Sequence, residues 1–162
     1  MAFALGCRAD QRAGESPSRG PTSTSEARDS AGGRDSVWAE LGRYYRDFTV
    51  RDWTAFADHF WRGATLTTVW MPPGEAGPRV VATTVADFVR QAPLGPGRQP
   101  IFSERMLDAE VRVHGNLAHA WARYEARFGT PGSVAVWWGI DAFTLMAHDG
   151  RWRIVALAYT DE

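Results

Sequence analysis

Asp141 is the residue of this sequence with the clearest potential for acid–base chemistry. It lies in an alternating segment, Gly139 to Leu145, on the same predicted strand face as Phe143 and Leu145. A carboxylate on an apolar face is costly to bury without a partner. If Asp141 is buried, desolvation raises its pKa and prepares it to act as a general base or acid. The alternative is a structural Asp that bonds to Tyr or Trp, or pairs with an Arg.

Two tyrosines and a glutamate are the candidates to act beside Asp141. Tyr124, a catalytic candidate like Asp141, could donate a hydrogen bond to the bound substrate, and Tyr45 could do the same. Glu104 begins a strand after a Pro/Gly-rich loop. Its side chain either faces the same pocket or is an exposed carboxylate at the end of that loop.

The histidines and the cysteine predict no metal site. His59 ends a predicted helix and is interpreted as a partner of the helix dipole. His114 and His119 flank a turn, and a metal site there would need further ligands. Cys7 is the only cysteine. The sequence also lacks a Gly-rich phosphate loop, a Gly-x-Ser-x-Gly elbow and a His-Glu-x-x-His motif. We therefore expect no metal and no cofactor.

Three short helices and one strand are expected in the first half of the folded part. Apolar residues recur at helical spacing after Ser36, a predicted N-cap, up to about Val50. Asp52 caps a second helix. The β-branched segment 64–70 predicts a strand, and 84–90 predicts a third helix that the following Pro and Gly residues end.

From Ile101 onward the sequence predicts only strands and turns. The strands are expected at 107–114, 117–129 and 134–147, with a last strand after the Asp149-Gly150 turn. Strands this long require a twisted and bent sheet, and Gly139 is the expected bending point. The prediction is an α+β fold in which a curved antiparallel sheet wraps around three N-terminal helices.

The first 35 residues differ from the rest of the chain. They are rich in Ser, Gly, Pro and Arg and poor in large apolar side chains, so we expect residues 1–35 to be a disordered tail before one domain, 36–162. Leu5-Gly6-Cys7 resembles the end of a bacterial lipoprotein signal, which suggests a truncated remnant of such a signal at 1–7. The chain is then either cytoplasmic, with a chance cysteine, or an exported lipoprotein whose start codon was assigned too late.

The order of elements resembles the nuclear transport factor 2-like superfamily, the cone-shaped fold of ketosteroid isomerase, scytalone dehydratase and SnoaL-type polyketide cyclases. The resemblance is carried by Tyr44-Tyr45, Phe60-Trp61, 111–118, 121–124, 139–143 and 150–154. It implies a conical cavity between the sheet and the helices. Neither the Tyr-plus-two-Asp set of the isomerase nor the paired His of the dehydratase matches this sequence in order. The fold alone leaves the activity open.

Aromatic residues and one acid are the expected lining of this cavity, unless the aromatics simply fill the core. The predicted ligand-binding residues are Tyr45, Phe48, Phe56, Trp61, Trp70, Phe88, Glu104, Tyr124 and Phe143. Such a cavity predicts a small apolar molecule as the partner. The first hypothesis is a SnoaL-like small-molecule-binding domain. The second is a cofactor-independent lyase, isomerase or cyclase that acts on an apolar carbonyl compound with Asp141 as general base.

The third hypothesis is a structural dimerisation domain. Trp121 and Arg123 are expected on the convex face of the sheet, with Trp137 or Trp138 beside them on the next strand and Trp137 taken as the interface residue. Exposed Trp beside Arg is typical of protein interfaces, so a homodimer is predicted. The net charge is −1 and no basic run occurs, which argues against a nucleic-acid partner. No apolar stretch reaches the ~20 residues of a membrane-spanning helix.

Overall fold

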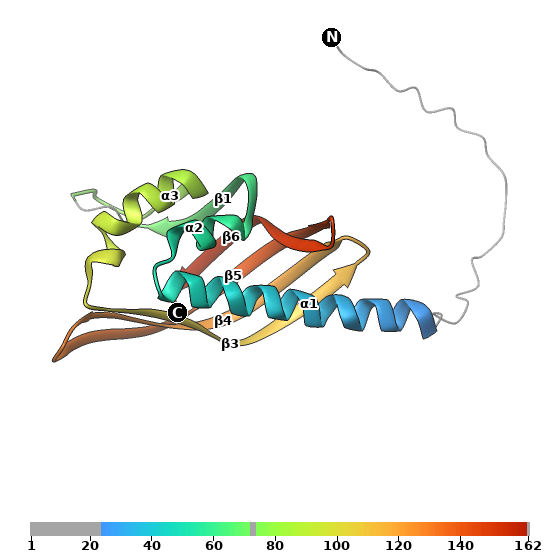
Figure 1. Ribbon diagram of the computed structural model, residues 1–162. Helices are drawn as coiled ribbons and strands as arrows, with labels where there is room; N and C mark the ends of the chain where they lie inside the picture. Colours follow the sequence, from blue (N-terminus) through green and yellow to red (C-terminus); the bar gives the residue numbers. More distant parts are fainter. Residues whose placement is uncertain (1–23, 72–73, 162) are drawn as a thin grey trace, which may run out of the picture.

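Six strands and three α-helices make up the fold (Figure 1). The structure, a computed structural model, describes residues 24–71 and 74–161. The helices are α1 (Thr24–Thr49), α2 (Trp53–Asp58) and α3 (Val85–Gln91), followed by two short 3₁₀ turns, Ala92–Leu94 and Pro96–Arg98. The strands are β1 (Phe60–Trp70), β2 (Arg79–Thr84), β3 (Ile101–His114), β4 (Leu117–Thr130), β5 (Ser133–His148) and β6 (Arg151–Asp161).

The strands form one sheet in the order β2-β1-β6-β5-β4-β3. All neighbouring strands are antiparallel except β1 and β6, which are parallel. The sheet is curved and does not close, and α1 lies across its concave side while α2 and α3 lie toward one end (Figure 1). The predicted α+β fold, a curved sheet around three helices, is confirmed.

The packing of α1 on the sheet follows from residue size. Its buried face carries an aromatic group, Tyr44, Tyr45 and Phe48, at helical spacing. The buried face of β4 instead carries alanines at every second position from Ala118 to Ala122. Because small side chains cover this part of the sheet, the large rings of the helix can approach it closely. The core therefore lies between α1 and the concave face.

Helix α1 begins at Thr24 instead of Ser36. Ser36 is not an N-cap, since it lies inside the helix and its hydroxyl donates to the Gly32 carbonyl at 2.8 Å. The missing side chain of Gly33 permits a close crossing of β3, because a Cβ there would lie 3.0 Å from Val113 Cγ1. Residues 24–35, expected in the tail, thus extend the helix. Residues 1–23, with the signal-like segment 1–7 and Cys7, lie outside the described residues.

Two differences in the first half concern β1 and β2. Strand β1 begins at Phe60, before the expected start, and β2 was not expected from the sequence. Strand β2 pairs with β1 in the register Leu66↔Thr83. It ends at Thr84, whose hydroxyl accepts a hydrogen bond from the Asp87 amide at 3.1 Å and so caps α3.

Candidate functional site

A cavity of about 250 Å³ lies between the concave face of the sheet and the end of α1. Its wall is mostly aromatic and aliphatic, and it also carries acidic and tyrosine side chains. The lining residues are Tyr44, Phe48, Leu66, Phe88, Phe102, Ser103, Glu104, Tyr124, Ala126, Arg127, Phe128, Trp137, Asp141, Leu157, Tyr159 and Asp161. An apolar hollow with a few polar groups is the usual form of a small-molecule site.

The hollow exists because β4 and β5 present small residues beside large ones. In the strand register Ala126 pairs with Trp137, and Tyr124 pairs with Gly139. A Cβ at Gly139 would overlap the Tyr124 side chain and the Thr160 carbonyl. Gly139 was expected as a bending point, and in the structure its lack of a side chain makes room for the ring of Tyr124.

Asp141 lies at the inner end of the cavity and is 3% exposed. The Tyr45 hydroxyl on α1 donates to Asp141 Oδ2 at 2.6 Å. Burial raises the pKa of Asp141 to about 7, although the hydrogen bond from Tyr45 opposes this shift. No hydrogen bond to Oδ1 occurs among the described residues. The predicted inward-facing carboxyl is therefore both anchored on one oxygen and free on the other.

Glu104 is a second carboxyl of the cavity, on β3. The Thr49 hydroxyl holds its backbone: it donates to the Glu104 carbonyl at 2.7 Å and accepts from the Glu104 amide at 2.9 Å. The side chain makes no hydrogen bond or ion pair within the described part of the chain. Burial raises the pKa of Glu104 well above its usual value, and the charges of Asp141 and Asp161 raise it further.

Among the described tyrosines, Tyr45 alone bonds to Asp141, and the three that line the cavity, Tyr44, Tyr124 and Tyr159, do not. The Tyr124 hydroxyl lies 3.3 Å from Asp161 Oδ1 and 3.4 Å from the Thr160 carbonyl, and it donates toward them. Tyr159 is the register partner of Asp141 on β6, and burial raises its pKa to about 12. Tyr124 therefore points to the rim of the cavity, where Asp161 is exposed.

The structure brings together five of the sequence-predicted site residues in the cavity wall: Phe48, Phe88, Glu104, Tyr124 and Asp141. Tyr45 reaches the site only through its hydroxyl on Asp141. Phe56 and Phe143 are completely buried in the core, where both contact the ring of Tyr44. Phe56 on α2 and Phe143 on β5 both lie deeper in the interior than the cavity does, so they pack the core.

Two further predicted residues lie away from the cavity. The Trp61 indole lies beside His148, and its Nε1 donates to the Met146 carbonyl at 3.5 Å. The Arg153 guanidinium lies 5.3 Å from the centre of the Trp61 ring. Trp70 ends β1 and is 52% exposed. Trp61 follows the buried Phe60 on β1, so its side chain points to the opposite face of the sheet, and Trp70 lies at the exposed end of the same strand.

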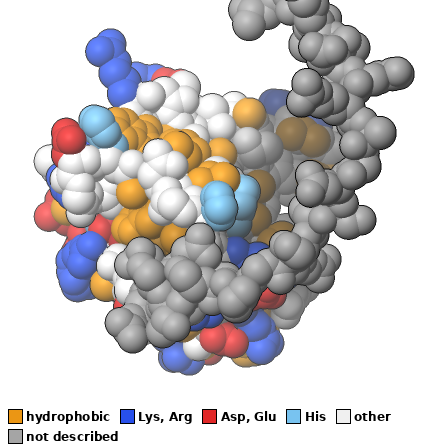
Figure 2. Space-filling model, turned by 90° about the vertical axis from the view of Figure 1, so that its right-hand side faces the viewer, with side chains coloured by type: hydrophobic (Ala, Val, Ile, Leu, Met, Phe, Trp, Pro, Cys, Tyr) orange, Lys and Arg blue, Asp and Glu red, His pale blue; other side chains and the backbone are white. Residues whose placement is uncertain are grey.

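Trp137 corrects the prediction for the convex face. It lines the cavity and packs against Phe128 at 6.3 Å between ring centroids. Because side chains alternate along β5, the outward residue is the next one, Trp138, which is exposed like Trp121. Figure 2, a view from the end at the right of Figure 1, shows hydrophobic side chains gathered on the surface near histidines.

Sequence reasoning missed three residues of the cavity wall that a simple signal could have found. Leu157, Tyr159 and Asp161 alternate on β6, so they share the face that the buried Leu157 defines. Asp161 stands on that face near the end of the last strand, where its register partner is Gly139. The same alternation that identified Asp141 thus also identifies a second acid.

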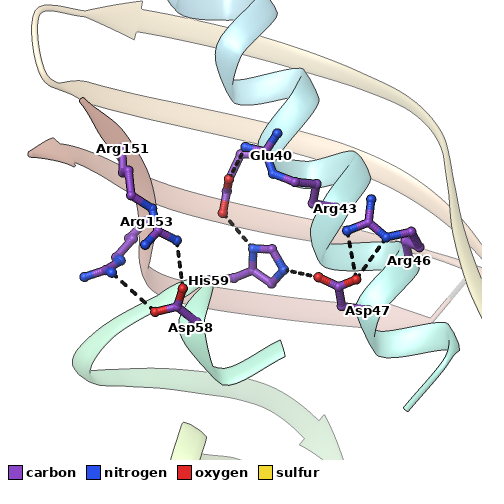
Figure 3. A network of polar contacts seen from close by, with 8 residues as sticks. All are labelled: Glu40, Arg43, Arg46, Asp47, Asp58, His59, Arg151 and Arg153. Carbon is purple, nitrogen blue, oxygen red and sulfur yellow. Dashed lines mark hydrogen bonds and ion pairs between the residues drawn. The ribbon is translucent and has the colours of Figure 1, made fainter. Parts of the chain in front are cut away.

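A separate polar cluster on α1 and α2 was also missed (Figure 3). The imidazole of His59 is buried between two carboxylates of α1, with Nδ1 2.6 Å from Glu40 Oε1 and Nε2 3.0 Å from Asp47 Oδ2. Arg43 pairs with Glu40 at 2.5 Å, and Arg46 pairs with Asp47 at 2.9 Å. Glu40 and Asp47 are two helical turns apart, which is the sequence signal that they share a face.

The paired charges set the pKa values of this cluster. Burial alone lowers the pKa of His59, but its hydrogen bonds with Glu40 and Asp47 outweigh burial and the pKa is raised. Burial raises the pKa of Glu40, but bonds to His59 and Arg43 outweigh it and the pKa is lowered. Within the described residues no group of His, Cys, Asp and Glu is arranged to hold a metal ion.

No helix in residues 24–71 and 74–161 has both the length and the apolar character that crossing a membrane requires.

Comparison with known proteins identifies the fold. No protein-family model and no curated protein sequence matches the chain. Solved structures do match. One is a nuclear transport factor 2-like protein of unknown function from Shewanella baltica, with a TM-score of 0.59 and 16% identity, covering 82% of this chain and 95% of that one.

Two further matches carry descriptions of activity. One, from Novosphingobium aromaticivorans, is proposed to be a scytalone dehydratase (TM-score 0.65, 12% identity, 82% of this chain and 85% of that chain). The other is the beta subunit of benzoate 1,2-dioxygenase from Burkholderia mallei (TM-score 0.63, 13% identity, 78% of this chain and 88% of that chain). At these identities the likeness concerns the fold, which is nuclear transport factor 2-like, as predicted.

Proposed function

From the nuclear transport factor 2-like fold and its cavity, we propose that this chain binds a small, mostly apolar molecule between α1 and the sheet. The observation that carries the proposal is an aromatic-walled hollow into which two carboxyl groups, of Asp141 and Glu104, present oxygens that have no partner among the described residues. A purely structural domain would fill this space, because unused cavities and unpaired buried acids both destabilise a protein.

The proposal is tested with a neutral aromatic probe, naphthylmethanol, titrated by calorimetry. We expect saturable binding with one site per chain. Ala126→Leu fills the hollow and should abolish binding, since Ala126 is buried in the cavity wall. Ala158→Leu adds the same side chain on the exposed outer side of β6 and is the matched control. Equal binding to both variants would contradict the proposal.

A second candidate function is acid–base catalysis on an apolar carbonyl compound. It is favoured by the coexistence of two cavity carboxyls with raised pKa values, Asp141 and Glu104. Ionised Asp141 would remove a proton from the carbon next to the carbonyl through Oδ1. Protonated Glu104 would donate a hydrogen bond to the oxygen on which negative charge develops. Tyr45 is engaged with Asp141 and would orient it.

Proton exchange provides the test of this second function. β-Tetralone, an apolar ketone, is incubated with the protein in deuterated water, and deuterium incorporation is followed by NMR. We expect faster exchange with the wild-type chain and the uncatalysed rate with Asp141→Asn. No acceleration by the wild-type chain, or an unchanged rate in the variant, would contradict catalysis while leaving ligand binding in place.

The convex face supports a proposal about assembly. Trp121 and Trp138 are exposed on neighbouring strands and lie on the same face as Arg123. Interfaces are enriched in Trp and Arg. We propose a homodimer through this face. Light scattering at micromolar concentration should give twice the chain mass, and Trp121→Glu with Trp138→Glu should give the monomer mass.

A further inference from the structure

We infer that the natural occupant of the cavity is an amine that is protonated when bound, carried on a compact aromatic or aliphatic body. The inference rests on the proposed function, since it requires that the cavity take up a small molecule. It goes further by assigning the charge of that molecule. The argument depends on which charged side chains face the hollow and which hydrogen-bonding positions they leave open.

Among the described residues, the charged side chains that face the cavity are acidic. Glu104, Asp141 and Asp161 project from the concave faces of β3, β5 and β6. Arg127 is part of the wall, but it is exposed and alternates with the inward-facing Ala126 and Phe128, so its side chain points to the outer face. Its charge acts there on Glu125.

Arg51 is another cation near the cavity, but it is not part of the cavity wall, and its buried Nε has no hydrogen-bond partner among the described residues. Its guanidinium lies 5.1 Å from the centre of the Phe102 ring and donates to the Gln99 carbonyl at 2.5 Å. Phe102 is part of the wall. Within the described residues, therefore, no basic side chain that lines the cavity neutralises its acids, and the charges of Asp141 and Asp161 add to burial in raising the pKa of Glu104.

The open hydrogen-bonding positions of the cavity include carboxylate acceptors beside the hydroxyls of Tyr44, Ser103 and Tyr159, and the carboxylates are the charged ones. Asp141 is buried, and its Oδ1 has no donor among the described residues although Oδ2 accepts from Tyr45. The Glu104 carboxyl likewise has no donor in the described part of the chain. A protonated amine carries several N–H donors and a positive charge, so it can serve both carboxylates at once. A carboxylate ligand would instead meet like charge.

The wall suits the same occupant. Phe48, Phe88, Phe102, Phe128 and Trp137 all line the hollow. The faces of aromatic rings attract cations, most strongly where water is excluded. The volume of about 250 Å³ is below the ~300–1,000 Å³ of sites for drug-sized ligands, which limits the occupant to roughly one or two rings.

The test compares three probes of one shape: naphthylmethylamine, naphthylmethanol and naphthoate. Calorimetric titrations near neutral pH should show the amine binding at least about tenfold more tightly than the alcohol, and naphthoate binding more weakly than either. Because the ammonium favours ionised carboxylates, amine binding should also release protons. Repeating the titration in buffers with different ionisation enthalpies measures that release.

Two isosteric variants connect the preference to the acids. Glu104→Gln and Asp141→Asn should each weaken amine binding by about tenfold or more and change alcohol binding by less than about threefold. Glu125→Gln, on the outer face, is the matched control and should change neither. Circular dichroism verifies folding, and if one variant does not fold, the other variant and the probe series still decide.

The possible outcomes separate the inference from the proposed function. Tighter binding of the amine, lost in the acid variants, supports both. Binding of the alcohol as tightly as the amine, or amine binding that survives both variants, overturns the inference and leaves the proposed function standing. Failure of all three probes to bind the wild-type chain overturns the proposed function and, with it, the inference.

Discussion

Two regions of this molecule bury acidic side chains, and they treat them in opposite ways. In the cluster on α1 and α2, Glu40 contacts both His59 and Arg43, and Asp47 contacts both His59 and Arg46. In the cavity, Asp141 has one neutral hydroxyl donor and Glu104 has no side-chain partner among the described residues. Residue type is the same in the two regions, so the difference lies in the partners that the fold supplies.

The pKa values express this difference. Cationic partners lower the pKa of Glu40 against the effect of burial, so its ionised form stabilises the fold. Burial without a cation raises the pKa of Asp141 to about 7, so its ionised form destabilises the fold. A destabilising acid in a cavity is typical of a site that has been selected for binding or chemistry. The paired cluster, by contrast, is typical of a structural element.

The largest effect is expected from removing one member of the paired cluster. Glu40→Ala leaves His59 buried beside a single half-buried carboxylate and leaves a void, so the free energy of unfolding should fall by about 3–5 kcal/mol. Urea denaturation measures the change. Asp58→Ala removes an exposed partner of Arg151 and Arg153 and is the control, with a loss below about 1 kcal/mol. Equal losses would remove the proposed distinction between buried and exposed pairs.

The opposite sign is expected in the cavity. Asp141→Asn keeps an acceptor for Tyr45 but removes the ionisation, so at about pH 8 the free energy of unfolding should rise by about 2–4 kcal/mol. Asp141 titrates near 3.8 when unfolded and near 7 when folded, so the folded protein loses stability as pH rises between these values. The gain should therefore vanish at about pH 4. Urea denaturation across this range checks it, and a loss of stability at high pH would assign Asp141 a structural role.

An intermediate effect is expected where the cavity wall is most crowded. Gly139→Ala places a methyl group against the Tyr124 ring and the Thr160 carbonyl, so the free energy of unfolding should fall by about 1–3 kcal/mol. The displaced Tyr124 should also weaken binding of the naphthyl probes. NMR signals of His59 should stay unchanged, because the cluster lies on α1 and α2. Altered His59 signals would show that the two regions are coupled.

The smallest effect is the pH dependence of the cluster. His59 has a raised pKa, so its contribution is complete below the unfolded value of 6.5 and is lost as pH rises through the folded value. Glu40 has a lowered pKa, so its contribution is complete above the unfolded value of 4.5 and is lost as pH falls. A double-mutant cycle with Glu40→Gln and His59→Gln measures the coupling energy between the two side chains. Between pH 4.5 and pH 6.5 this coupling energy should be about 0.5–3 kcal/mol, and it should decline at lower and at higher pH. A coupling energy independent of pH would contradict charge pairing.

Prediction from the sequence succeeded where a local pattern is enough. The aromatic spacing of α1 and the alternation around Asp141 placed Tyr45 and Asp141 in the interior, and both lie there. It failed for Trp137, although Trp137 lies four residues before Asp141 on the same strand and the alternation that placed Asp141 in the interior also places Trp137 there. It also failed for Trp61 and Trp70, because the start of β1 at Phe60 turns Trp61 to the opposite face and the end of β1 leaves Trp70 exposed.

What the sequence alone determined is the order of most helices and strands and which residues within one strand share a face, since these follow from local periodicity. Tertiary structure decided which acids meet a cation. Glu40 and His59 lie 19 residues apart, and Tyr45 and Asp141 lie 96 apart, so only the packing of α1 against α2 and the sheet brings each pair together. The electrostatic character of a buried carboxyl is set by such distant neighbours, and a local pattern does not contain them.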